Sequence, residues 1–142
     1  MNARRILAVD FGERRTGLAA TDWSGTIAVP LPRIEASDEA AVIAAIVAVV
    51  RERETELVVL GMPLAIDGGL GQRAQRTAQF RDRLQQALPC PLATQDESHS
   101  TDEAHELLKA GGLKAKRRKE LADSTAALVI LERYRAAQHR RS

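Results

Sequence analysis

The chain has 142 residues, of which 44% are hydrophobic and 28% charged, and its formal net charge is +2. This composition and length are typical of a globular protein whose core is stable without disulfides or structural metal ions. We therefore expect one domain over residues 1–142 with a short basic C-terminal tail. The single cysteine, Cys90, excludes an internal disulfide and a cysteine-based zinc site. We expect no secretory signal and no membrane partner, because the apolar runs are too short, and this predicts a cytoplasmic protein.

The first predicted elements are a buried strand, a charged turn and a second strand. Ile6–Val9 is an apolar run typical of a buried strand, Asp10 follows where that strand ends, and Thr16–Thr21 resumes a strand-like pattern. A carboxylate at the end of a central strand is costly to desolvate unless it is paired or binds a cation. Asp10 is therefore either a metal ligand at the base of an active site or the first residue of a hairpin turn.

The rest of the chain alternates helices and strands. The predicted elements are a strand over Thr26–Ile34, a helix from the N-cap Ser37 to about Arg53, a strand over Leu57–Leu60, a helix over Gln72–Ala87, a strand over Pro91–Thr94, a helix over Ser100–Ala110 and a last helix over Leu121–Ala137. Prolines in the third strand place it at a sheet edge, because proline has no amide hydrogen to donate. This order predicts an α/β fold with a mixed five-stranded sheet flanked by helices.

Acidic residues from separate segments are expected at one edge of this sheet. The strands beginning near Ile6, Leu57 and Leu92 should be parallel neighbours, because helices of crossover length connect them. Ligands of such sheets bind at the carboxyl ends of the strands, where Asp10 and Glu97 fall.

Asp123 is the third candidate acid, expected in the first turn of the last helix. One explanation is favourable placement of an acid near a helix N-terminus. The small residues Thr125–Ala127 predict instead that this helix packs close to the sheet and brings Asp123 near Asp10 and Glu97. Three carboxylates at one point repel one another unless divalent cations offset their charge. An oxygen-only set of this kind suits Mg²⁺ or Mn²⁺.

Positive charge is concentrated in the C-terminal part of the chain. Residues 1–99 carry 11 basic and 13 acidic side chains, whereas residues 100–142 carry 10 basic and 6 acidic ones. This asymmetry indicates a polyanionic partner, and an aromatic content of 3% indicates that nucleic acid would be bound by its backbone and shape. Arg15 is either a phosphate-binding residue or a solvated hairpin charge. The densest basic run is either a backbone-binding arm or a solvated loop, and its cations are Lys114, Lys116, Arg117, Arg118 and Lys119.

Residues 5–135 resemble the YqgF/RuvX-like family of the ribonuclease H-like superfamily. The resemblance is carried by Asp10-Phe11-Gly12 with Arg15 and Gly17, the turn Gly61-Met62-Pro63, the loop from Asp67-Gly68 to Gly71, Asp96-Glu97 with Ser100-Thr101, and Asp123 with Ala126-Ala127. It implies a ribonuclease H-like fold, with Asp10, Glu97 and Asp123 as catalytic residues that bind two Mg²⁺ or Mn²⁺ ions per active site. The chain departs from the family pattern at Ser98 and His99, where an arginine and a bulky apolar residue are usual.

The resemblance also implies a hydrolase of phosphodiester bonds in structured RNA or branched DNA. The resemblance implies two candidate substrates. We place the 5′ end of precursor 16S ribosomal RNA first and a Holliday junction second. Junction cleavage needs two symmetric sites and hence a homodimer, whereas RNA trimming is compatible with a monomer. The loop at 67–71 is either a phosphate cradle or a flap.

Two other classes of protein stay open. An ATP-binding module of the actin and sugar-kinase type also begins with an aspartate and a hairpin under the nucleotide phosphates. A nucleic-acid-binding module without catalysis would keep the fold and lose the chemistry.

Overall fold

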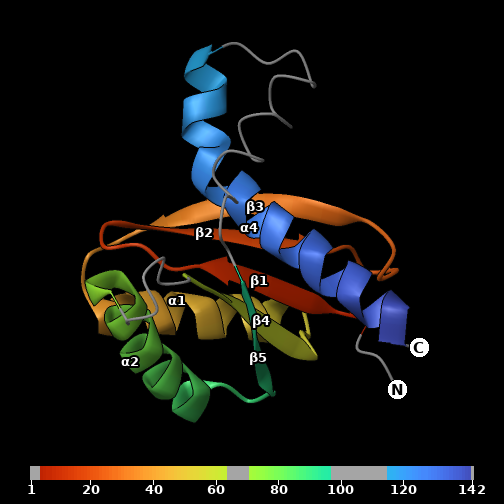
Figure 1. The fold of residues 1–142 in the computed structure, drawn as a ribbon, viewed down its shortest axis with the longest axis horizontal. Helices are drawn as coiled ribbons and strands as arrows, with labels where there is room; N and C mark the ends of the chain where they lie inside the picture. The colour runs from red at the N-terminus through yellow and green to blue at the C-terminus, as the bar shows by residue number, and fades with distance from the viewer. Residues whose placement is uncertain (1–3, 64–70, 97–114, 142) are drawn as a thin grey trace.

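The computed structural model describes residues 4–63, 71–96 and 115–141, and in the last of these ranges it describes the side chains of residues 124–138. The elements are β1 (Ile6–Asp10), β2 (Arg15–Thr21), β3 (Ala28–Glu35), α1 (Glu39–Glu52), β4 (Leu57–Met62), α2 (Gln72–Ala87), β5 (Leu92–Asp96) and α4 (Ala115–Arg141). They form the expected α/β architecture, with one mixed five-stranded sheet flanked by helices (Figure 1). Among the described residues, no helix has the length and apolar character needed to cross a membrane.

The strand order of the sheet is β3-β2-β1-β4-β5. β1 pairs with β2 and β2 with β3 in antiparallel fashion, as consecutive hairpins do. β1, β4 and β5 are parallel neighbours, which confirms the prediction made from the crossover helices. β3 lies at an edge of the sheet, as its two prolines predict. Proline has no amide hydrogen, and a strand at an edge is hydrogen-bonded on one side only.

Three predicted helix boundaries are wrong. α1 begins at Glu39 with Asp38 as its N-cap residue, one position after the predicted N-cap Ser37. α4 begins at Ala115 instead of Leu121 and continues to Arg141, so the basic run from 116 is helical and the tail is not separate from the helix. The physical reason is that the run consists of Ala, Lys, Arg, Glu and Leu, which are strong helix formers, and no glycine or proline interrupts it. The helix predicted over 100–110 lies outside the described residues.

The two faces of the sheet are covered by different helices (Figure 1). Because side chains alternate along a strand, Leu7 and Val9 of β1 pack toward α1 and α2, while Ile6 and Ala8 pack toward α4. The core on the α1 and α2 side contains large residues, among them Phe80. The core on the α4 side is built from small residues and a few branched ones, namely Ile6, Ala8, Ala19, Val59, Ala127, Ile130 and Leu131. These small residues let α4 approach the sheet closely, as predicted.

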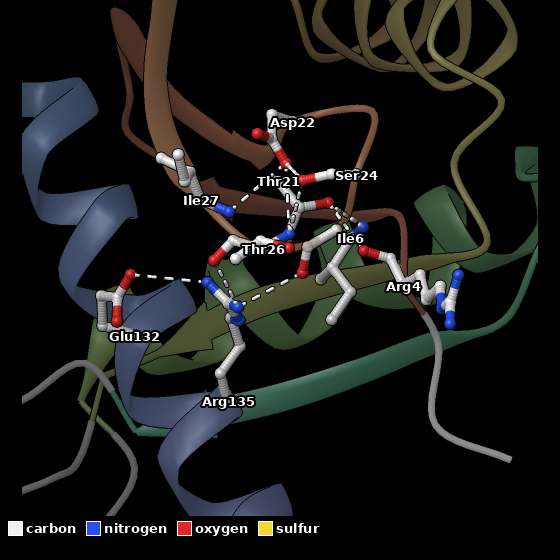
Figure 2. Close-up of polar contacts among 10 residues, drawn as sticks. Arg4, Ile6, Thr21, Asp22, Ser24, Thr26, Ile27, Glu132 and Arg135 are labelled. Carbon is white, nitrogen blue, oxygen red and sulfur yellow. Dashed lines mark hydrogen bonds and ion pairs between the residues drawn. The ribbon is translucent and has the colours of Figure 1, made fainter.

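Hydrogen bonds to β3 and to the β2–β3 turn fix the position of α4 along the sheet. Near the start of the described side chains, Ser124 Oγ donates to the carbonyl oxygen of Leu31 at 2.6 Å. Eleven residues later, Arg135 Nη2 donates to the carbonyl oxygens of Thr26 at 2.8 Å and Gly25 at 3.3 Å (Figure 2). The helix therefore runs from β3 to the β2–β3 turn with little freedom to slide.

The β2–β3 turn is itself held by the Asp22 carboxylate (Figure 2). Asp22 Oδ1 accepts hydrogen bonds from the Ser24 hydroxyl at 2.7 Å and the Thr26 amide at 3.1 Å. These bonds lower the pKa of Asp22, with the Ser24 hydroxyl as the main cause. Gly25 has a φ of +76°, a conformation that favours glycine. This turn presents the two carbonyl oxygens that Arg135 binds.

Candidate functional site

Asp10 is a mostly buried carboxylate at the carboxyl end of the central strand β1. Its side chain is 14% exposed, and it lies opposite Gly17 of β2 in the antiparallel register. Arg73 Nη2, from the first turn of α2, lies 3.6 Å from Asp10 Oδ1. Positive charge beside a buried carboxylate reduces the cost of its desolvation. Asp10 is therefore paired with a cationic side chain, which is one of the two ways in which the desolvation of a strand-end acid is offset.

The turn after Asp10 is held rigidly by packing on both sides. The Phe11 ring stacks on Phe80 of α2, with centroids 3.9 Å apart and an interplanar angle of 6°, and Phe80 is fully buried. A Cβ added to Gly12 would lie 2.3 Å from the carbonyl oxygen of Arg15, closer than any real Cβ contact. Only glycine therefore allows the chain to fold back so tightly between β1 and β2.

Glu97, the second predicted acid, lies outside the described residues. The residue before it, Asp96, ends β5 and pairs with Met62 of the parallel strand β4. The Asp96 carbonyl oxygen accepts a hydrogen bond from Arg133 Nη1 of α4 at 3.3 Å. The carboxyl end of β5 is thus tied to α4.

Asp123, the third predicted acid, lies in α4, and its side chain is outside the described residues. Its predicted place in the first turn of the helix is wrong, because α4 begins at Ala115. The helix-dipole explanation for this acid therefore fails, since that effect decays within the first turn. The next residue, Ser124, binds Leu31, which is in register with Leu18 and, through it, with Val9. The α4 backbone at Ser124 is thus level with the last residues of β1.

The described side chains hold no group of three or more His, Cys, Asp or Glu that could bind a metal ion. Of the three predicted acids, Asp10 is the one whose side chain the structure describes. Its carboxylate oxygens are of the ligand type that hard divalent cations prefer.

Arg15 is the first residue of β2, is exposed, and lines a groove of about 770 Å³ that adjoins Asp10. Lys114 lies outside the described residues. The other four predicted nucleic-acid-binding cations, Lys116, Arg117, Arg118 and Lys119, lie in the first turns of α4, and their side chains are not described. These turns project beyond the sheet in Figure 1.

Sequence reasoning missed three arginines of the same groove, Arg14, Arg73 and Arg76. Arg76 Nη1 donates to the Glu13 carboxylate, which links α2 to the β1–β2 turn across a separation of 63 residues. The sequence feature that could have indicated two of them is the i, i+3 spacing of Arg73 and Arg76, which places both side chains on one face of a helix.

Comparisons with known proteins agree along almost the whole chain. The RuvX family model, described as a Holliday junction resolvase, matches residues 4–136. A protein of Chloroflexus aurantiacus named "Putative pre-16S rRNA nuclease" is 41% identical over 134 residues, which cover 94% of this chain and 88% of the relative. A protein of the same name from Synechococcus elongatus is 40% identical over 128 residues, 90% of this chain and 86% of the relative.

Solved structures of resolvases share the fold. Thermus thermophilus RuvC in complex with a Holliday junction substrate has a TM-score of 0.61 at 15% identity, with 94% of this chain and 96% of that chain covered. The Fowlpox virus resolvase in complex with Holliday junction DNA has a TM-score of 0.57 at 10% identity, with 94% and 98% covered. These likenesses confirm the ribonuclease H-like fold. The chain belongs to the RuvX Holliday junction resolvase family, a family of nucleases that hydrolyse phosphodiester bonds.

Proposed function

We propose that this protein is a divalent-metal-dependent endonuclease that processes the 5′ end of precursor 16S ribosomal RNA. The observation that carries this proposal is the 41% identity, over 94% of the chain, to a relative named for that activity. The position of Asp10, a mostly buried acid at the carboxyl end of β1, supports the nuclease chemistry independently of that name.

Cleavage of a Holliday junction is the second candidate, because the matching family model carries that description. A junction has two equivalent strands to cut, so this activity requires a homodimer with two symmetric sites. RNA processing makes no such demand and is compatible with a monomer.

We propose Asp10, Glu97 and Asp123 as the catalytic acids that would hold two Mg²⁺ or Mn²⁺ ions. The described part of this site offers one mostly buried carboxylate, Asp10, the kind of oxygen ligand that such ions prefer, and the ions would take the place of Arg73 as the positive charge beside it. When bound, the ions would supply activation of the attacking water and stabilisation of the leaving oxygen. Arg15 would pair with phosphate oxygens and orient the nucleic-acid backbone at the cleavage point, because a guanidinium group can donate two parallel hydrogen bonds to a phosphate.

The expected test of substrate is a comparison of cleavage rates on two matched substrates. A precursor 16S ribosomal RNA fragment should be cut at its 5′ side in Mg²⁺ or Mn²⁺, and a four-way DNA junction should be cut more slowly. Gel mobility with end-labelled strands measures both rates in parallel. A protein that cuts the junction in symmetric pairs and leaves the RNA intact would reverse the order of the two candidates.

The basic start of α4 is proposed to bind the nucleic-acid backbone. Arg117→Ala with Arg118→Ala should weaken binding of all substrate sequences and reduce the slope of log affinity against log salt by up to about two units. The helix should persist, because alanine has the highest helix propensity. Fluorescence anisotropy at several salt concentrations measures the slope.

A matched control exists at the other end of the same helix. Arg140→Ala with Arg141→Ala removes an identical pair of charges from the last turn of α4. This variant should keep a salt slope close to that of the unmodified protein. Equal slopes for the two double variants would indicate that the basic start of α4 is a solvated surface.

A further inference from the structure

A groove runs from the candidate site along the first half of α2, and we call it the α2 groove. Its walls are the β1–β2 turn, residues 11–15, and α2 residues 73–79, with Ser37 and Glu39 also in its lining, and its volume is about 770 Å³. It begins beside Asp10, because Phe11 follows Asp10 in the chain and Arg73 pairs with the Asp10 carboxylate. Substrate that reaches the candidate site from this side must therefore pass along the groove.

The lining of the α2 groove is positively charged. Four arginines, Arg14, Arg15, Arg73 and Arg76, line it together with the two acids Glu13 and Glu39. Among the described residues, Arg76 is held by Glu13 and Arg73 by Asp10, whereas the side chains of Arg14 and Arg15 make no hydrogen bond or ion pair. Both of these are exposed. Two guanidinium groups in the lining of the groove are thus available for a phosphate ligand.

The dimensions of the groove set how much of a strand it can contact. A volume of about 770 Å³ lies within the range of small-molecule pockets, so the groove can hold a short stretch of one strand. From Arg73 to Gln79 the helix rises about 9 Å at 1.5 Å per residue. That length corresponds to roughly two to three steps of a stacked strand at about 3.4 Å per step.

We infer that the α2 groove binds the sugar–phosphate backbone of a single strand that leaves the cleavage point, over two to three nucleotides. This inference rests on the proposed nuclease function and adds a requirement to it, since the substrate must present an unpaired strand beside the scissile bond. Arg14 and Arg15 bind the phosphates directly. The ion pair between Arg76 and Glu13 joins the two walls of the groove.

The first experiment measures binding of a 12-nucleotide single-stranded RNA in Ca²⁺. Arg14→Ala with Arg15→Ala should reduce affinity at least tenfold and lower the salt slope by about 1.4 units, at about 0.7 per cation for a single strand. Arg51→Ala with Arg81→Ala removes two cations that do not line the groove, and it should leave affinity within twofold. Equal losses in both variants, or no loss in either, would overturn the inference.

The second experiment maps the path of the strand by crosslinking in a Cys90→Ser background. Gln79→Cys places a thiol in the lining of the groove, and Gln85→Cys places one on the same helix beyond it. RNA carrying a thiol-reactive group should crosslink to the first variant, with a maximum two to three nucleotides from the scissile bond, and not to the second. Equal crosslinking at both positions contradicts the inference.

The two experiments separate failure of the inference from failure of the proposed function. If the unmodified protein binds and cuts its substrate while the groove variants and crosslinks show no preference, the inference alone is wrong. If the unmodified protein binds no nucleic acid at all, both the inference and the proposed function are wrong.

Discussion

Asp10→Asn is expected to reduce cleavage by at least about a thousandfold while the protein stays folded. The substitution keeps the shape of the side chain and removes the negative charge that a divalent cation requires, and a thousandfold loss corresponds to about 4 kcal/mol in the barrier. Stability without metal should stay the same or rise, because the amide is cheaper to bury than the carboxylate. The ion pair that is lost involves an Arg73 side chain that is 62% exposed, so it contributes little.

The measurements are single-turnover cleavage in Mn²⁺, thermal unfolding without metal and calorimetric titration with Mn²⁺. Glu97→Gln and Asp123→Asn should behave in the same way. Asp82→Asn is the matched control, because Asp82 is an exposed carboxylate of α2, away from the sheet edge, and it should leave cleavage unchanged. Near-normal turnover by any one of the three site variants would show that the residue is not a catalytic acid.

The same experiment decides between the nuclease and a binding module without catalysis. A binding module would show metal-independent association and no cleavage even in the unmodified protein. An ATP-binding module would instead be stabilised against heat by nucleotide with Mg²⁺. The family match over residues 4–136 favours the nuclease, since it covers the C-terminal segments that the ATP-binding interpretation leaves without a role.

Much of the fold could be predicted because local signals and packing agree. The bounds of α2 were predicted correctly at both ends, where Gly71 precedes the helix and Pro89 follows it closely. The parallel order of β1, β4 and β5 followed from buried apolar runs joined by helices. Small residues predicted close packing of α4, and Ala127 is fully buried against the sheet.

The start of α4 differs from the predicted one because a dense run of like charge is typical of a solvated loop, whereas the residues of this run have high helix propensity. The groove was missed for a different reason. Its walls come from the β1–β2 turn and α2, and the pairs that join them, Arg73 with Asp10 and Arg76 with Glu13, are long-range contacts that no local pattern indicates. A sequence can predict that an arginine lies on one face of a helix, but not which acid it meets.

Gly12→Ala is expected to cause the second large loss of activity, by acting on the backbone that positions Asp10. The added Cβ would lie 2.3 Å from the Arg15 carbonyl oxygen, which belongs to the backbone at the start of β2 and cannot rotate away as a side chain would. The turn must therefore open, and Asp10, two residues earlier in the chain, moves with it. We expect cleavage to fall by about a hundredfold, since a displacement of about 1 Å at a reacting centre has that effect. Overpacking of this kind should also lower the free energy of unfolding by about 1–3 kcal/mol.

Gly71→Ala is the matched control, because it adds the same methyl group at the N-cap of α2, the helix on which Phe11, the neighbour of Gly12, stacks. Gly71 precedes α2 with a φ of −67°, and a Cβ built there meets nothing within 4 Å. Its loss of stability should stay below about 1 kcal/mol, as expected for glycine replaced at an N-cap, and cleavage should stay close to that of the unmodified protein. Thermal unfolding and single-turnover cleavage of the two variants give the comparison. If Gly12→Ala keeps both its stability and its cleavage rate, the turn tolerates a side chain, and the close approach to Arg15 does not determine the position of Asp10.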